Sequence, residues 1–243
     1  MRRRFFVEEF SDDSAFLHGE SAEHLGRVLR AKPGQLYELS DGESLWLGRV
    51  EHVIPPGRNG TSIEFSLVEP LEAVQPTLRF ELLVSIVKFE RFEWCLEKAA
   101  EFGVREIIPV AAARSEKKLV AAAGKRSERW GKILFDAAQQ SRQMRPPTLH
   151  KVMRAEEAFA YSRAGCQFLL SERQDARSVR SVQMGCLSKF IAVAVGPEGG
   201  WTDGEFSSAR TAGFYETSLG EGVFKTETAV IAALSILKYA LGE

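Results

Sequence analysis

A glycine-rich loop between a strand and a helix start constrains this chain more than any other feature. The β-branched run 193–195 ends in Gly196-Pro197-Glu198-Gly199-Gly200, and Thr202 with Glu205 has the spacing of a capping box that opens a helix. Loops of this kind are where α/β sheets bind ligands. Because Glu198 would repel a phosphate and no Gly-Lys-Ser/Thr follows, the loop predicts a neutral or cationic ligand.

A second junction of the same kind lies downstream. The strand-like run from Phe214 to Leu219 leads through Gly220 and residues 221–225 into a helix that starts at Thr226. Each loop closes a strand and precedes a helix start that carries an acid. We therefore expect the two loops to meet over one ligand, although a glycine loop taken alone is equally compatible with a plain tight turn.

Charge does not by itself indicate a nucleic-acid partner, because the formal net charge of the 243 residues is -1. Basic residues are nevertheless uneven. They open the chain at Arg2-Arg3-Arg4 and gather again between residues 117 and 145. Local patches would have to hold RNA, and the middle cluster is also compatible with a solvated helix face.

The three cysteines, Cys95, Cys166 and Cys186, are scattered and odd in number, so we expect no disulfide framework and a reducing cytosol. No spacing of histidines with cysteines suggests zinc, and no metal site is predicted. Every apolar run is interrupted well before about 18 residues, so the chain should be soluble and intracellular.

Turn signals and periodicity divide the chain in two. Short strand-like runs separated by Lys32-Pro33-Gly34, residues 41–43 and Pro55-Pro56-Gly57 predict a small β-barrel over residues 1–72. After a linker at residues 70–76, strands alternate with helices, which predicts a parallel α/β domain over residues 76–243. The helices are expected at 89–102, with Gly103 as a C-cap, and at 125–142, 203–212 and 226–241.

Several motifs together resemble the SPOUT class of S-adenosylmethionine-dependent RNA methyltransferases. The loop at 196–200 and the later segment 219–229 are similar to the two cofactor loops of that class. Lys88, Glu93 and residues 97–104 look like a segment of the bacterial 16S rRNA (uracil-N3)-methyltransferase family, and His24 to Arg30 resembles its N-terminal domain. The resemblance implies a C-terminal trefoil knot, an N-terminal PUA-like barrel, S-adenosylmethionine as cofactor, and methylation of N3 of a uridine in small-subunit rRNA.

The resemblance also implies site residues for the cofactor. They come from three loops and the start of the last helix: Leu170, Ser171, Glu172, Gly196, Pro197, Glu198, Gly199, Gly200, Ser218, Leu219, Gly220, Val223, Phe224, Thr226 and Thr228.

Methylation at N3 requires loss of an imide proton and tolerance of the resulting negative charge. Glu198 is the candidate to accept the proton or orient the base, and Lys88, Arg114 and Lys225 are candidates to stabilise the anion. Structural interpretations remain open, since Glu198 could cap the following helix and Lys88 could be an exposed helix start.

RNA contacts are expected from basic residues of the N-terminal domain and of the middle cluster, chiefly through phosphates. The candidates are Arg2, Arg3, Arg4, His24, Arg27, Arg30, Lys32, Arg142 and Arg145. The last helix carries more apolar side chains than one covered face needs, and with the resemblance this predicts a homodimer.

The chain departs from the family pattern at two positions of the second loop. Gly222 and Lys225 stand where the family has arginines, and a lysine lacks the bidentate fork of arginine. Two alternatives therefore stay open: another SPOUT methyltransferase that acts on a 2'-hydroxyl or N1 position, and a non-catalytic RNA-binding assembly factor.

Overall fold

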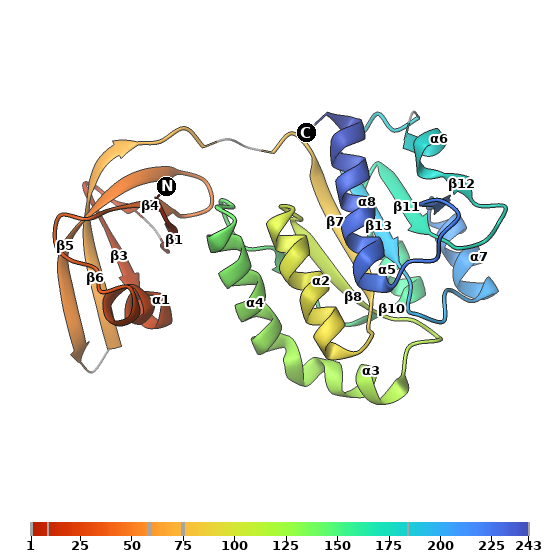
Figure 1. Cartoon of the computed structure of the whole chain (residues 1–243), viewed down its shortest axis with the longest axis horizontal. Coiled ribbons are helices and arrows are strands. Elements are labelled where there is room, and N and C mark those ends of the chain that lie inside the picture. The colour runs from red at the N-terminus through yellow and green to blue at the C-terminus, as the bar shows by residue number, and fades with distance from the viewer. Residues whose placement is uncertain (1, 9, 58–59, 74–75, 184, 243) are drawn as a thin grey trace. The chain divides into compact units, whose positions relative to one another are not determined.

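In the computed structural model the chain forms two compact units (Figure 1). The N-terminal unit comprises residues 1–75 together with 138–146, and the C-terminal unit comprises residues 76–137 and 147–243. The structure describes residues 2–8, 10–57, 60–73, 76–183 and 185–242. The segment 138–146 thus belongs to the N-terminal unit although it lies in the middle of the sequence.

The N-terminal unit is a curled six-stranded sheet. Neighbouring strands are antiparallel except for the pair β1–β4. Helix α1 (Gly19–Glu23) and the π-helical turn His24–Val28 pack on the sheet through Ala22 and Leu25. The strand order is β1 (Arg4–Phe6), β4 (Leu36–Ser40), β5 (Leu45–Gly57), β6 (Gly60–Pro70), β3 (Ser14–His18) and β2 (Phe10–Ser11).

The core of this unit follows from period-two alternation. Ile63 and Phe65 of β6 are fully buried, while Ser62, Glu64 and Ser66, which alternate with them, are only partly buried. The turn expected at Pro55-Pro56-Gly57 is wrong, because β5 continues to Gly57. Its register with β6 shifts between Ile54 and Gly57, and prolines are tolerated in a sheet at such irregularities.

The C-terminal unit is built on a parallel sheet, as its alternation of strands and helices predicts. The central strands β7 and β13 carry almost continuous apolar runs because helices cover both faces. The strand order is β10 (Met153–Arg154), β8 (Glu106–Ala111), β7 (Arg79–Ser85), β13 (Phe190–Val195), β11 (Cys166–Leu170), β14 (Tyr215–Ser218) and β12 (Arg177–Ser178), with β9 (Thr148–Leu149) beside β8.

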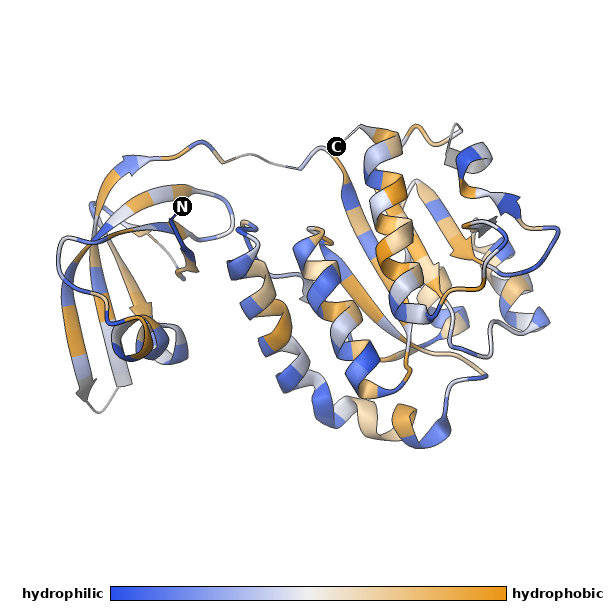
Figure 2. Ribbon diagram, viewed as in Figure 1, coloured by the Kyte–Doolittle hydropathy of each residue, from blue (hydrophilic) through white to orange (hydrophobic). Residues whose placement is uncertain are grey.

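Alternate residues of β7 face two separate cores. Leu82 and Val84 pack under α2 (Phe89–Glu101), α4 (Ser127–Gln140) and α8 (Thr226–Leu241), whereas Leu83 packs under α5 (Ala155–Tyr161) and α7 (Asp203–Thr211). Apolar residues accordingly run along α8 and the strands behind it in Figure 2. None of the helices in the described part of the chain has the length and apolarity needed to cross a bilayer.

The helices expected at 89–102, 203–212 and 226–241 are confirmed within one or two residues, and Gly103 adopts a positive φ of 74° after α2. The helix expected from residue 125 is wrong at its start. Residues 124–126 form a 3-10 turn that joins α4 to a separate helix, α3 (Lys117–Ala123), which the sequence did not predict. Helix α6 (Val179–Gln183) was missed as well.

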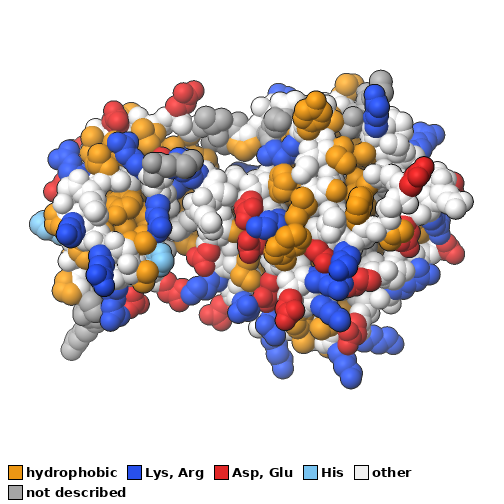
Figure 3. Space-filling model, in the orientation of Figure 1, with side chains coloured by type: hydrophobic (Ala, Val, Ile, Leu, Met, Phe, Trp, Pro, Cys, Tyr) orange, Lys and Arg blue, Asp and Glu red, His pale blue; other side chains and the backbone are white. Residues whose placement is uncertain are grey.

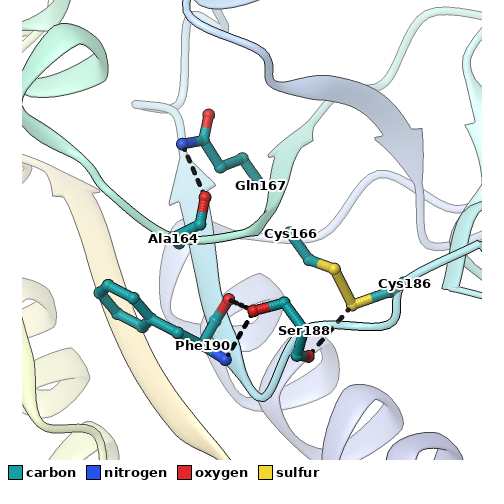
Figure 4. The surroundings of a disulfide bond; sticks show 6 residues. All are labelled: Ala164, Cys166, Gln167, Cys186, Ser188 and Phe190. Carbon is teal, nitrogen blue, oxygen red and sulfur yellow. Dashed lines mark hydrogen bonds between the residues drawn. A yellow bond between two sulfur atoms is a disulfide. The ribbon is translucent and has the colours of Figure 1, made fainter.

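The expectation that the cysteines remain unpaired is wrong for two of them. Cys166 and Cys186 form a disulfide (Figure 4). Cys95 is free and buried. Cys166 opens β11, which pairs with β13, and Cys186 lies four residues before β13 starts. The pairing of these two strands brings the cysteines together, so their scatter along the sequence gave no indication of it.

Candidate functional site

A cavity of about 220 Å³ opens where three strands of the C-terminal sheet end. Because β11, β13 and β14 are parallel, their carboxyl ends lie at one edge of the sheet. The loops that leave these strands supply Ser171, Gly196 and Gly220 to the cavity wall, and α8 supplies Thr226 and Ala229. The two glycine loops do meet at one cavity.

Most residues that the sequence analysis assigned to a cofactor line this cavity. They are Leu170, Ser171, Glu172, Gly196, Pro197, Glu198, Gly200, Ser218, Leu219, Gly220, Val223, Phe224 and Thr226. Gly199 and Thr228 are not part of the described lining. Residues that the analysis did not assign to the cofactor complete it: Arg114, Arg173, Val195, Trp201, Phe206, Gly222 and Ala229.

Trp201 determines the shape of the first glycine loop. Its indole Nε1 donates a hydrogen bond of 3.1 Å to the carbonyl of Leu170, at the end of the neighbouring strand. A Cβ on Gly196 would lie 3.1 Å from that Nε1, so a larger residue would require the indole or the loop to shift by a few tenths of an ångström. Gly200 has φ of 67° and donates to the Pro197 carbonyl at 2.8 Å, which closes the turn.

The predicted capping box at the start of α7 is confirmed. Thr202 accepts from the backbone N–H of Glu205, and Glu205 Oε2 accepts from the backbone N–H of Thr202 at 2.7 Å. The other oxygen of Glu205 accepts from the N–H of Ala113 at 2.8 Å. This buried carboxylate therefore joins α7 to the segment that leaves β8.

Arg114 lines the cavity and holds the main chain of the glycine loop. Its Nη1 donates to the carbonyls of Gly199 at 2.8 Å and Trp201 at 3.2 Å. A Cβ on Gly199 would lie 3.2 Å from Arg114 Cβ, a tight contact that a larger residue would relieve only by a shift of Arg114 or the loop. On the opposite side, Thr226 Oγ1 donates to the Gly196 carbonyl at 3.0 Å. Two side chains thus fix the main chain of the loop at both of its ends.

Arg91 of α2 binds the only acid of the glycine loop, and the sequence analysis did not single it out. Its Nη1 lies 2.9 Å from Glu198 Oε1, and its Nε lies 3.7 Å from Glu227 Oε1 on α8. Cys95 lies one turn further along α2. Its pKa is raised to about 12, chiefly by burial and then by the charges of Glu227 and Glu198. The Cys95 thiol is therefore neutral at physiological pH.

The two lysines that were candidate anion stabilisers precede helices. Lys88 is the N-cap of α2 and Lys225 is the N-cap of α8, and neither belongs to the described lining of the cavity. Their predicted roles stay predictions.

Some of the candidate RNA-binding residues are engaged inside the N-terminal unit. Arg4 forms an ion pair of 3.0 Å with Glu38 and donates to the Arg142 carbonyl, and its side chain is only 11% exposed. Arg142 lies 3.6 Å from the same Glu38, and Arg27 pairs with Glu23. Arg4 and Arg142 therefore attach the segment 138–146 to the sheet of this unit.

The cavity suits a ligand without phosphate. Its charged lining residues are Arg114, Glu172, Arg173 and Glu198. Both arginines are already engaged: Arg114 binds two loop carbonyls, and Arg173 pairs with Asp203 and stacks on the Phe206 ring at 3.8 Å. Glu198 is engaged in turn by Arg91 through Oε1. The polar surface that remains is Glu172, the second oxygen of Glu198, hydroxyls and main chain, which matches a cationic centre.

A cavity at the strand ends of a parallel α/β unit is typical of proteins that bind small ligands. Comparison with known sequences identifies the family. The RNA methyltransferase domain family matches residues 74–238, and the chain belongs to it.

Similar proteins span nearly the full length of the chain. It is 26% identical over 233 residues to ribosomal RNA small subunit methyltransferase E of Mesomycoplasma hyopneumoniae, covering 96% of this chain and 97% of the relative. The crystal structure of that methyltransferase from Neisseria gonorrhoeae, bound to S-adenosyl methionine, has a TM-score of 0.86 at 27% identity, covering 99% and 98% of the two chains. A Legionella pneumophila methyltransferase structure with the same cofactor has a TM-score of 0.84 at 27% identity, with the same coverage. The resemblance on which the sequence analysis rested is thereby confirmed.

Proposed function

We propose that this protein transfers a methyl group from S-adenosylmethionine to N3 of a uridine in 16S rRNA. The observation that carries the proposal is the cavity that both glycine loops line, formed largely by residues that the sequence assigns to the cofactor. Support comes from relatives that are named for methylation of small-subunit rRNA or that contain S-adenosylmethionine.

The lining fits this cofactor on the chemistry of its groups. S-adenosylmethionine supplies an activated methyl group on a cationic sulfonium and carries no phosphate. Glu172 and Glu198 offer negative charge, and main chain around Gly196 and Gly220 offers carbonyls at close approach. The Trp201–Leu170 hydrogen bond joins the glycine loop to the end of β11.

Glu198 is the proposed acceptor of the N3 proton. Arg91 binds its Oε1, and within the described chain Oε2 has no such partner, so one oxygen is held while the other is available. Arg114, Lys88 and Lys225 are the proposed cations that stabilise charge on the uracil oxygens. Because N3 lies on the Watson–Crick edge, the uridine must be unpaired or flipped before it reacts.

The N-terminal unit is the proposed RNA-gripping module. We infer a PUA-like barrel in this unit and a trefoil knot in the C-terminal unit from the resemblance to the SPOUT class, since the chain belongs to the RNA methyltransferase domain family. Since Arg4 and Arg142 are engaged in the unit itself, whereas the Arg27–Glu23 pair is exposed, phosphate contacts fall to Arg27 and the other basic candidates. These are Arg2, Arg3, His24, Arg27, Arg30, Lys32 and Arg145.

A homodimer is the proposed assembly. Much of α8 packs in its own unit, since Val230, Leu234 and Leu237 are fully buried, and its apolar excess therefore supports a dimer less than the sequence suggested. Trp94 on α2 and Tyr239 on α8 remain exposed, and hydrophobic side chains gather over these helices in Figure 3. Light scattering at micromolar concentration should give twice the monomer mass of 27.0 kDa, and a monomer mass would end this proposal.

The cytoplasm is the proposed location, because the RNA substrate is made there. Thiols of cytosolic proteins are held reduced, so Cys166 and Cys186 should be found largely as thiols in the cell. Alkylation of free thiols in a fresh lysate, followed by mass spectrometry, measures this directly.

Mapping of rRNA modifications by mass spectrometry, in cells with and without the protein, tests the proposal. We expect one 3-methyluridine in 16S rRNA to disappear with the protein. Loss of a 2'-O-methyl or N1-methyl group instead would favour another SPOUT activity. An unchanged map, with no binding of S-adenosylmethionine in calorimetric titration, would favour a non-catalytic RNA-binding factor.

A further inference from the structure

A second cavity lies at the same edge of the C-terminal sheet. It encloses about 500 Å³ and is formed by the end of β8, helix α3 and the start of α5. Strand β8 runs parallel to β7 and β13, so its carboxyl end faces the same side as the strand ends that form the first cavity. No residue in this second cavity belongs to the cofactor assignment.

One thin wall separates the two cavities. Arg114 lines the first, while its neighbours Ala113 and Ser115 line the second. In the same way, Phe206 lines the first and Glu205 the second. The hydrogen bond from Ala113 to Glu205 holds this wall together. Ligands in the two cavities would therefore be near neighbours.

The floor of the second cavity combines small apolar side chains with one buried hydroxyl. Ala111 and Ala112 leave room for a flat ring. Ser115 is only 7% exposed, and its Oγ is buried without a hydrogen-bond partner in the described chain. Because a buried hydroxyl without a partner costs free energy, a polar group of a ligand would satisfy it.

The rim of the cavity is cationic. Lys117 and Arg154 are exposed there, and within the described residues neither forms an ion pair. Of the two acids, Glu205 is buried, and its oxygens accept from Ala113 and Thr202. Among the lining residues Glu156 is thus the one acid left to oppose the two cations, so the rim favours an anion.

We propose that the second cavity binds a nucleotide of the RNA strand next to the methylated uridine. The base or ribose lies on the alanine floor, and a rotation of the Ser115 side chain brings its buried Oγ into a hydrogen bond with it. The backbone phosphate lies between Lys117 and Arg154. This inference rests on the proposed function, because it assigns the neighbour of the reacting nucleotide.

The test uses a double variant, Lys117→Ala with Arg154→Ala. The control is a second double variant, Lys151→Ala with Lys189→Ala, at two exposed lysines outside both the cavity and the basic cluster 117–145. With a 16S rRNA fragment as substrate, the first variant should raise KM for RNA roughly tenfold and reduce the salt slope of RNA binding by about 1. The kcat and the affinity for S-adenosylmethionine should stay within about twofold of wild type. The control pair should change none of these quantities.

Ser115→Ala separates ligand binding from a structural role. Removal of a buried hydroxyl that lacks a partner should leave the melting temperature equal or higher, yet KM for RNA should rise. Wild-type KM and salt slope in both cavity variants would overturn the inference. If the wild-type protein binds the RNA but does not methylate it, the proposed function fails, and the same variants in an RNA-binding assay still decide the inference.

Discussion

Arg91 on α2 and Glu198 in the glycine loop form an ion pair of 2.9 Å, and the same guanidinium lies 3.7 Å from Glu227 on α8. The main chain of the loop is fixed independently, by Arg114 at Gly199 and by Thr226 at Gly196. Arg91 therefore acts on the side chain of Glu198 and not on the backbone that surrounds the cofactor.

Arg91→Met should lower kcat by roughly tenfold to a hundredfold, because the carboxylate would lose its fixed orientation. Affinity for S-adenosylmethionine should stay within about twofold, since the loop backbone keeps its own supports. Arg91→Lys should restore part of the rate. In a Glu198→Gln background the change at Arg91 should have no further effect; fully additive losses would show that Arg91 does not act through Glu198.

Gly199→Val should weaken binding of S-adenosylmethionine by tenfold or more, about 1.4 kcal/mol, and leave the fold intact. The new side chain would press on Arg114, whose Cβ lies 3.2 Å from the position of a Cβ on Gly199, and would displace the loop. Gly204→Ala in α7 is the matched control, because nothing lies within 4 Å of its Cβ. Calorimetric titration and circular dichroism measure both variants, and wild-type affinity in a folded Gly199→Val protein would remove this loop from the site.

Reduction of the Cys166–Cys186 disulfide should lower the free energy of unfolding by about 3 kcal/mol, since it releases a loop closed over a sequence separation of 20. That loop carries Ser171 and Glu172 of the cavity wall, so affinity for S-adenosylmethionine should fall as well. Denaturant midpoints with and without dithiothreitol measure the first effect. Cys166→Ser with Cys186→Ser should reproduce the reduced protein, and equal midpoints in all three samples would contradict the account.

Glu81→Gln should stabilise the protein at neutral pH. The pKa of Glu81 is raised above 4.5, chiefly by burial and further by the charge of Glu106. A hydrogen bond from Ser162 and the charges of His150 and Arg79 lower it, but by less. The folded state therefore holds this proton more tightly than the unfolded state. The stability that it contributes is present below the unfolded pKa and is lost as pH rises through the folded pKa.

The gain in melting temperature from Glu81→Gln should accordingly be larger at pH 7 than near pH 4.5. Glu72→Gln, at an exposed carboxylate, serves as the control and should show no such trend. A gain that is the same at both pH values would mean that the ionisation of Glu81 does not affect stability.

Local sequence signals predicted the elements that build the site. The capping box at Thr202 and Glu205, the start of α8 at Thr226 and the turn after α2 each depend on residues within a few positions of one another. The contacts that organise the site depend on residues far apart. Arg91 and Glu198 are separated by 107 positions, and Arg114 and Gly199 by 85.

Long-range pairing also explains the other differences. The segment 138–146 belongs to the N-terminal unit because the hydroxyl of Ser40 donates to the Met144 carbonyl at 2.7 Å and Arg4 binds the Arg142 carbonyl. The disulfide forms because β11 and β13 are neighbours. Periodicity and turn signals do not indicate which strands become neighbours, so they could not predict these contacts.

The most direct test of the proposed activity is methylation in vitro by the purified protein. Small-subunit rRNA, both free and assembled, is incubated with S-adenosylmethionine that carries an isotopically labelled methyl group, and the digested nucleosides are analysed by mass spectrometry. We expect the label in 3-methyluridine and its loss with Glu198→Gln. Label in a different methylated nucleoside, or no incorporation into either RNA by protein that binds the cofactor, would contradict the proposed function.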